Sequence, residues 1–179
     1  MKILVIQQKM IGDVLISSIL CNNLRTAYPE AQIDYLVYAS TTPVLEGNPN
    51  IDTIILFEEK HRKSKKEFLS LALQIRATKY DIIIDAYSKL ESWLIVFLSG
   101  AKKKISYEKK GRKFLYTDNI PYQAAPKTNF GLAIERRLSL LDPLKLSIQI
   151  DPLPKLFVTD EENQKAVKLF EKYQLKKDR

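Results

Sequence analysis

The amino-acid sequence predicts an α/β fold with a doubly wound, mainly parallel sheet, and three observations support this prediction. Short runs of apolar, β-branched residues such as Ile3–Ile6 recur along the chain and are typical of buried strands. Segments with helical spacing of their apolar residues separate these runs. Of the 179 residues, 45% are hydrophobic, which suits the core of one domain. Because strands that alternate with helices form βαβ units, the sheet is predicted to be Rossmann-like.

The first half of the chain predicts, in order, a strand over Ile3–Ile6, a helix over Asp13–Tyr28, a strand over Ile33–Tyr38, a short helix over Pro43–Glu46 and a strand over Thr53–Phe57. The first helix is expected to end before Pro29, because the residue before a proline disfavours helical backbone. The short helix ends at Gly47.

The second half predicts a helix over Lys65–Thr78, a strand over Tyr80–Asp85, a helix over Leu90–Leu98, a strand over Lys104–Tyr107, an irregular segment over 108–127 and a helix over Asn129–Leu141. A capping box, Thr159 followed three residues later by Glu162, marks a last amphipathic helix that reaches about Tyr173. We therefore expect a domain over residues 1–155, and a helical segment over 156–179 that leads away from it.

The segments that follow the predicted strands are expected to converge. In a parallel α/β sheet, ligands bind beyond the carboxyl ends of the strands. Residues 7–13, 58–66 and 85–91 each follow a strand, so they should meet at one edge of the sheet.

The net charge of +8 favours partners that carry negative charge, such as nucleic acid, anionic lipid headgroups or phosphorylated sugars. The cations gather in two clusters, over residues 60–66 and 102–113. A charged run is most often solvated surface. Two clusters in loops of one domain nevertheless favour a shared basic face.

The sequence also bears on the cellular compartment. No apolar run approaches the ~18 residues that span a bilayer, and the start of the chain lacks the pattern of a signal peptide. The single cysteine, Cys21, cannot form an internal disulfide, which fits a reducing compartment. We therefore expect a cytoplasmic protein.

The first strand leads into a helix through Gly12 and Asp13, and this junction has two interpretations. Asp13 can be a helix N-cap, because the free N–H groups and the helix dipole favour a carboxylate there by about 0.3–1 kcal/mol. Alternatively, Asp13 faces a ligand and accepts a proton from a sugar hydroxyl. Gly12 is expected to permit a tight turn and the close approach of a ligand. Neither a G-x-G-x-x-G fingerprint nor a P-loop occurs in the chain.

A series of short matches runs in order along residues 1–158. They are Gly12-Asp13-Val14-Leu15, Tyr28-Pro29, Ile33-Asp34, Leu45-Glu46-Gly47-Asn48-Pro49, Ile51-Asp52, Tyr80-Asp81, Ile84-Asp85-Ala86 and Glu135-Arg136. In this order they resemble the amino-terminal half of glycosyltransferase family 9, the ADP-heptose:lipopolysaccharide heptosyltransferases.

The resemblance implies a GT-B architecture of two Rossmann-like domains that face each other across a cleft. The amino-terminal domain would bind the acceptor, an inner-core sugar on a lipid A anchor. The carboxyl-terminal domain, absent from this chain, would bind the nucleotide-sugar donor, ADP-heptose. Transfer would invert the anomeric centre without a metal or other cofactor, with Asp13 as the general base. This chain alone would then be an inactive fragment.

The resemblance and the basic clusters together imply an acceptor site made of Lys9, Met10, Gly12, Lys60, Arg62, Lys63, Tyr87, Ser88, Lys110 and Arg112. The family often has Gln-Gly or His-Gly and then a basic residue after its fourth strand, where this chain has Tyr87-Ser88 and then Glu91. The expected partners are the donor and an anionic glycolipid. The positive charge also implies peripheral contact with the inner face of the inner membrane, worth about 1 kcal/mol per basic residue.

Two other functions fit the sequence. A non-catalytic basic α/β module that binds nucleic acid or a phosphorylated ligand would explain the charge, although no RNA-binding signature occurs and nucleic acid is not the expected partner. A structural domain with solvated loops is the third possibility.

Overall fold

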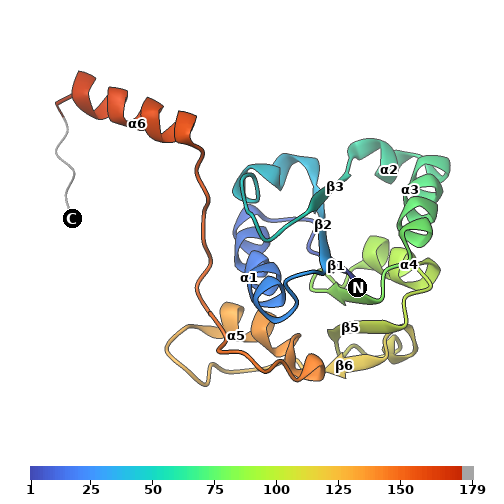
Figure 1. Ribbon diagram of the computed structural model, residues 1–179. Helices are drawn as coiled ribbons and strands as arrows, with labels where there is room; N and C mark the ends of the chain where they lie inside the picture. Colours follow the sequence, from blue (N-terminus) through green and yellow to red (C-terminus); the bar gives the residue numbers. More distant parts are fainter. Residues whose placement is uncertain (175–179) are drawn as a thin grey trace.

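The computed structural model describes residues 1–174, and its centre is a six-stranded sheet in which each strand runs parallel to its neighbours (Figure 1). The order across the sheet is β3-β2-β1-β4-β5-β6. The strands are β1 (Lys2–Ile6), β2 (Gln32–Tyr38), β3 (Thr53–Phe57), β4 (Ile82–Asp85), β5 (Lys103–Tyr107) and β6 (Asp118–Ile120). This is the Rossmann strand order, so the predicted α/β fold is confirmed.

Helices cover both faces of the sheet. In Figure 1, α1 and α5 lie on one face, whereas α3 and α4 lie on the other. The helices are α1 (Ile11–Ala27), α2 (Glu59–Lys63), α3 (Lys65–Thr78), α4 (Leu90–Leu98), α5 (Leu132–Ser139) and α6 (Asp160–Lys172), with 3₁₀ turns η1 (Ala39–Val44), η2 (Lys113–Leu115) and η3 (Asp142–Leu144).

The side chains of the central strand alternate between two cores. Ile3 and Val5 of β1 pack in the core shared with α1 and the end of α5, and Leu4 and Ile6 pack in the core shared with α3 and α4. All four side chains are fully buried. Because both faces of β1 are covered, its sequence is a continuous apolar run rather than an alternating one.

Several elements differ from the prediction. The short helix predicted over Pro43–Glu46 is instead the 3₁₀ turn η1, which begins earlier, at Ala39, and ends at Val44. The irregular segment predicted over 108–127 contains η2 and the three-residue strand β6. This strand is short and only half-buried, so its sequence shows no alternating pattern. The first basic cluster contributes most of α2, a five-residue helix of four charged residues and His61 that has no apolar periodicity to reveal it. Helix α5 begins at Leu132 rather than Asn129, because Gly131 adopts a φ of 90°.

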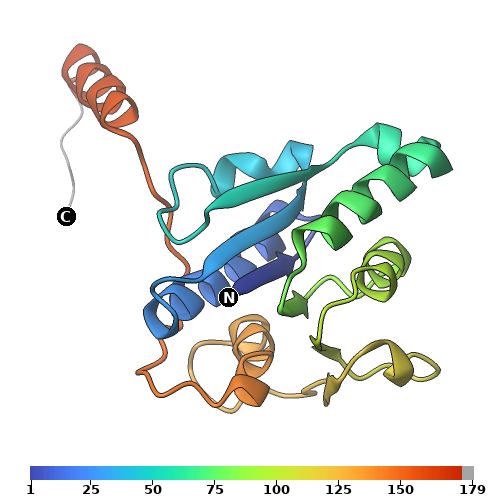
Figure 2. The ribbon, with the colours of Figure 1, turned by 45° about the vertical axis from the view of Figure 1, so that its right-hand side comes forward.

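The chain leaves the sheet on the side of α1. An extended segment follows η3, and the side chain of Asn23 in α1 bonds the backbone of Asp151 through both its amide nitrogen and its oxygen, each at 2.8 Å. Helix α6 then lies apart from the other helices (Figures 1 and 2) and has no buried residue. The predicted capping box of Thr159 and Glu162 is confirmed. The domain division at residue 155 stays a prediction, and the end of its second segment lies outside the described residues.

Candidate functional site

The predicted site residues follow strands whose carboxyl ends share one edge of the sheet, because all six strands are parallel. The strand order reverses between β1 and β4, and the crevice at such a reversal is where doubly wound sheets bind ligands. Lys9 and Met10 follow β1, and Tyr87 and Ser88 follow β4, so the two segments flank this point. The predicted convergence of residues 7–13, 58–66 and 85–91 is confirmed.

Asp13 is not the N-cap of its helix, so that interpretation of the junction is wrong. Helix α1 begins two residues earlier, and its N-cap is Met10, which makes no side-chain capping bond. The predicted tight turn at Gly12 is wrong as well, because the left-handed backbone falls on Met10, with a φ of 62°. Such a conformation costs a non-glycine residue about 1–3 kcal/mol, and residues of this kind cluster at active sites and ligand-binding sites. Gly12 lies in the first helical turn, with open space where a Cβ would be.

Asp13 is held by Arg137, which comes from α5 on the same face of the sheet. The Asp13 Oδ1 atom lies 3.0 Å from Arg137 Nη2. The guanidinium also donates to Ser17 Oγ at 2.6 Å and to the Tyr107 hydroxyl at 3.0 Å. The side chain of Arg137 is 10% exposed, whereas that of Asp13 is 45% exposed. Asp13 therefore has one oxygen fixed by a buried cation, and its Oδ2 atom accepts no hydrogen bond from residues 1–174.

Tyr107 completes this arrangement at the end of β5. Its hydroxyl accepts from Arg137 and donates to the backbone oxygen of Arg136 at 2.9 Å. Burial raises the pKa of Tyr107, so the phenol stays neutral and can both donate and accept a hydrogen bond. The sequence prediction missed Arg137, because its pairing with Asp13 joins residues 124 positions apart.

The neighbouring pair Glu135 and Arg136, one of the sequence matches, organises the loop before α5. Glu135 accepts bonds from Thr128, from the backbone of Lys127 and from Gln123. These bonds, with that of the Thr128 hydroxyl first, lower the pKa of Glu135 to about 2. Arg136 donates twice to the Gln123 carbonyl and stacks on the Tyr122 ring. This pair fixes the approach to α5 and hence the position of Arg137.

The first basic cluster is partly neutralised by acids. Lys60 pairs with Glu58 at 2.6 Å, and Arg62 and Lys63 lie 3.9 and 3.6 Å from Glu59. The net charge of the 60–66 segment therefore overstates its free positive charge. His61 lies in the same helix, but it is a structural residue. Its Nδ1 atom accepts the Glu58 N–H at 2.9 Å, its ring packs on Phe57, and burial lowers its pKa.

The second basic cluster is anchored to the loop after β4. Lys109 donates to the backbone oxygen of Ser88 at 2.7 Å, and Arg112 stacks 3.3 Å from the centroid of the Trp93 ring. Ser88 is itself buried, so its side chain is not presented at the surface, whereas Tyr87 is half-buried and Lys110 is exposed. Lys9 lies apart from this cluster, 4.8 Å above the Tyr38 ring.

Asp85, at the end of β4, gives the loop its shape. Its Oδ1 atom accepts the backbone N–H groups of Tyr87 and Ser88 at 3.1 and 2.8 Å, and its Oδ2 atom accepts the Tyr116 hydroxyl at 2.6 Å. Burial raises the pKa of this fully buried carboxyl. Asp85 is thus a structural acid that sets the start of α4, not an acid open to a ligand.

We expect Asp85→Ala to lower the free energy of unfolding by about 2–5 kcal/mol, because it leaves two N–H groups and one buried hydroxyl without a partner. Urea denaturation measures this change. Asp81→Ala, at the other end of β4, removes one part-buried acceptor of the Lys2 N–H and should cost about 1 kcal/mol. Equal losses in the two variants would contradict the role of Asp85.

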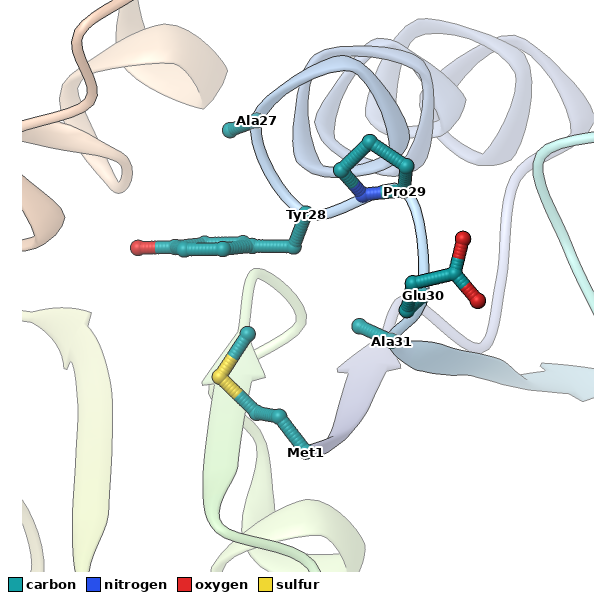
Figure 3. Close-up of a pocket in the computed structure, with 6 residues that line it drawn as sticks. All are labelled: Met1, Ala27, Tyr28, Pro29, Glu30 and Ala31. Atoms are coloured by element: carbon teal, nitrogen blue, oxygen red, sulfur yellow. The ribbon is translucent and has the colours of Figure 1, made fainter.

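Two hollows mark the two edges of the sheet. A hollow of about 500 Å³ lies between α2, α3 and the start of α4, and its lining includes Arg62, Lys63, Leu90 and Glu91. It is at the edge that carries Asp13. A smaller hollow of about 290 Å³ lies where α1 ends (Figure 3), between Met1 and the Tyr28 segment. Because this second hollow is at the amino ends of β1 and β2, it is not the candidate site.

Comparisons with known proteins show what the chain is similar to. The model of a family described as glycosyltransferase family 9 (heptosyltransferase) matches residues 68–178. Lipopolysaccharide heptosyltransferase 3 of Escherichia coli is 31% identical over 141 residues, which are 74% of this chain and 40% of that protein. The chain therefore spans about 40% of the length of this relative.

Solved structures show the same fold. A family 9 glycosyl transferase from Veillonella parvula DSM 2008 superposes with a TM-score of 0.77 at 20% identity, over 98% of this chain and 50% of the other. An E. coli heptosyltransferase solved with ADP-2-deoxy-2-fluoro heptose superposes with a TM-score of 0.67 at 20% identity, over 85% of this chain and 52% of the other.

Proposed function

Because the chain belongs to glycosyltransferase family 9, we propose that it supplies the acceptor-binding half of a sugar-transferring enzyme. The sugar is a heptose carried by a nucleotide diphosphate, and the acceptor is a lipopolysaccharide core or a similar surface glycan. The observation that carries the proposal is the half-exposed Asp13, which Arg137 holds at the ligand-binding edge of the sheet. The nucleotide is bound by a second domain outside this chain.

The proposed reaction needs one proton acceptor. The acceptor hydroxyl oxygen attacks the anomeric carbon of the donor, and the bond from that carbon to the diphosphate oxygen breaks. Asp13 Oδ2 takes the hydroxyl proton, and the nucleoside diphosphate leaves with the bonding electron pair. Attack from the side opposite the leaving group inverts the anomeric centre. General-base catalysis of this kind contributes about 10²–10⁴-fold to a rate.

Cations near this edge would bind the anionic groups of the acceptor. Arg62 and Lys63 line the hollow beside α4. Arg112, in the loop after β5, stacks on the Trp93 ring. Lys9 lies four residues before Asp13 in the sequence. Met10, Gly12, Lys60, Tyr87 and Lys110 complete the proposed acceptor site, whereas Ser88 is buried and contributes only to the shape of its loop. The acid Glu91 in the hollow favours an acceptor with a hydroxyl rather than a phosphate at that point.

The complete enzyme tests this proposal directly. With ADP-heptose and a core acceptor that lacks its outer heptose, we expect a product of inverted configuration at an unchanged rate in EDTA. Mass spectrometry of the product and NMR of its anomeric proton measure the two properties. Retention of configuration would contradict the single-step reaction, and loss of transfer in EDTA would contradict metal independence. Failure of every nucleotide sugar to react would overturn the assignment of activity.

A further inference from the structure

We propose that the outward face of α3 and α4 is a docking surface for an anionic lipid bilayer. We call it the α3–α4 face, and its members are Leu69, Leu73, Leu90, Leu94 and Phe97. These side chains are each between 45% and 63% exposed. Monomeric proteins seldom expose large apolar side chains in a contiguous group, and such groups mark sites of interaction.

The stripe on α4 follows from helix geometry. Ser92, Ile95 and Val96 are the buried residues of this helix. Leu90, Leu94 and Phe97 have the spacing i, i+4 and i+7, so they line the opposite side, which faces solvent. A helix that is apolar on both its buried and its solvent side is not explained by packing on the sheet alone.

Helix α3 extends the same apolar surface. Leu71, Ala72 and Ile75 face the core, whereas Leu69 and Leu73 are exposed. Arg76 follows Leu73 by three residues and donates to the backbone oxygen of Leu98 in α4 at 3.2 Å. This bond places that side of α3 against α4, so the exposed side chains of the two helices are neighbours.

Cations flank the apolar surface on both sides. Arg62, Lys63 and Lys65 share the hollow between α3 and α4 with Leu90 and Leu94. On the other side, η2 packs against α4 and carries Phe114, which is 79% exposed and directly follows Arg112 and Lys113 in the sequence. Apolar side chains at the centre with basic residues at the rim match the boundary between acyl chains and anionic headgroups.

The course of the chain leaves this surface open. The segment after α5 runs over α1, on the opposite face of the sheet (Figures 1 and 2), and its Asp151 is bonded to Asn23 of that helix. Within residues 1–174 there is no helix with the length and apolarity to cross a bilayer, so contact through this face would be interfacial. Because α4 starts just after the loop of Tyr87 and Ser88, the docked face adjoins the edge that carries Asp13.

The 179-residue chain itself provides the test, and its only tryptophan, Trp93, is a probe on α4. We expect the chain to co-sediment with vesicles of phosphatidylcholine and phosphatidylglycerol, more weakly with phosphatidylcholine alone, and less as salt rises. Trp93 emission should shift to the blue on binding. The double variant Leu94→Ser/Phe97→Ser should bind at least about tenfold more weakly, because it removes two large apolar side chains.

A matched control comes from the extended segment on the α1 side. Leu153→Ser/Leu156→Ser also removes two exposed apolar side chains and should bind vesicles as the unaltered chain does. The charge variant Lys63→Ser/Lys65→Ser should lose the preference for phosphatidylglycerol, which tests the surface without altering its apolar part. Equal binding by all variants, or no binding by the unaltered chain, would overturn the proposal. So would self-association that Leu94→Ser/Phe97→Ser abolishes, because a second copy would then be the occupant. None of these readouts depends on chemistry at Asp13.

Discussion

Replacing Arg137 with leucine is expected to lower the rate of transfer by the complete enzyme about 10–100-fold, with a smaller change in the acceptor KM. Arg137 fixes Asp13 Oδ1 at 3.0 Å, and without it the carboxylate can rotate away from the acceptor. A misplacement of about 1 Å can cost 10²-fold in rate. The free energy of unfolding should also fall by about 2–4 kcal/mol, chiefly through the buried bonds to Ser17 and Tyr107, because water screens the ion pair on the side of Asp13.

A matched ion pair at the other edge of the sheet separates positioning from stability. Arg25 pairs with Asp52 at 2.6 Å, and these side chains are 21% and 43% exposed. Arg25→Leu should destabilise the fold without changing the rate of transfer at a temperature where the protein is folded. Arg137→Lys keeps the charge but loses the planar set of donors, so it should recover only part of the rate. An unchanged kcat in Arg137→Leu would refute the positioning role.

Local patterns were sufficient for most of the fold. The limits of α3, α4 and β3 agree with the prediction residue for residue, because each has a strong apolar pattern and a clear end. The start of α1 was less predictable. The sequence predicts a helix that begins at Asp13, a favoured capping residue, but the helix begins at Ile11 because Met10 adopts a left-handed backbone. No local signal in a methionine indicates that conformation.

The candidate site was only partly predictable, because its decisive contacts are long-range. The sequence placed Asp13 correctly at the first strand–helix junction. It could not indicate that α5 brings Arg137 to this carboxylate, or that Ser88 is buried beneath Lys109. A count of charges also overestimates the free positive charge of the first basic cluster, because Glu58 and Glu59 pair with its cations.

The family resemblance was confirmed, but it does not fix the role of Asp13. The matched family model covers residues 68–178, so the first strand–helix junction lies outside it. The proposed role of Asp13 therefore follows from its exposure, its buried partner Arg137 and the edge of the sheet on which it lies.

Asp13→Asn should abolish general-base catalysis while leaving the shape of the site intact, because an amide oxygen can still accept the Arg137 bond. We expect transfer to fall by about 10²–10⁴-fold. The unfolding midpoint should change little. Asp13 is half-exposed, so solvent screens its ion pair with Arg137 and the pair contributes little to the free energy of unfolding. Asp52→Asn provides the matched control at the opposite edge, with a carboxylate of similar exposure that is also paired with an arginine. Its rate should equal that of the unaltered enzyme.

The most direct test of the central claim is the single-turnover rate of transfer by the Asp13→Asn enzyme with saturating acceptor and labelled ADP-heptose. Saturation removes any effect on binding, so the rate reports the chemical step alone. If Asp13 takes the acceptor proton, acceptor affinity will stay close to normal while this rate falls at least about a hundredfold. A rate close to that of the unaltered enzyme would contradict the claim, and another group would have to be the base.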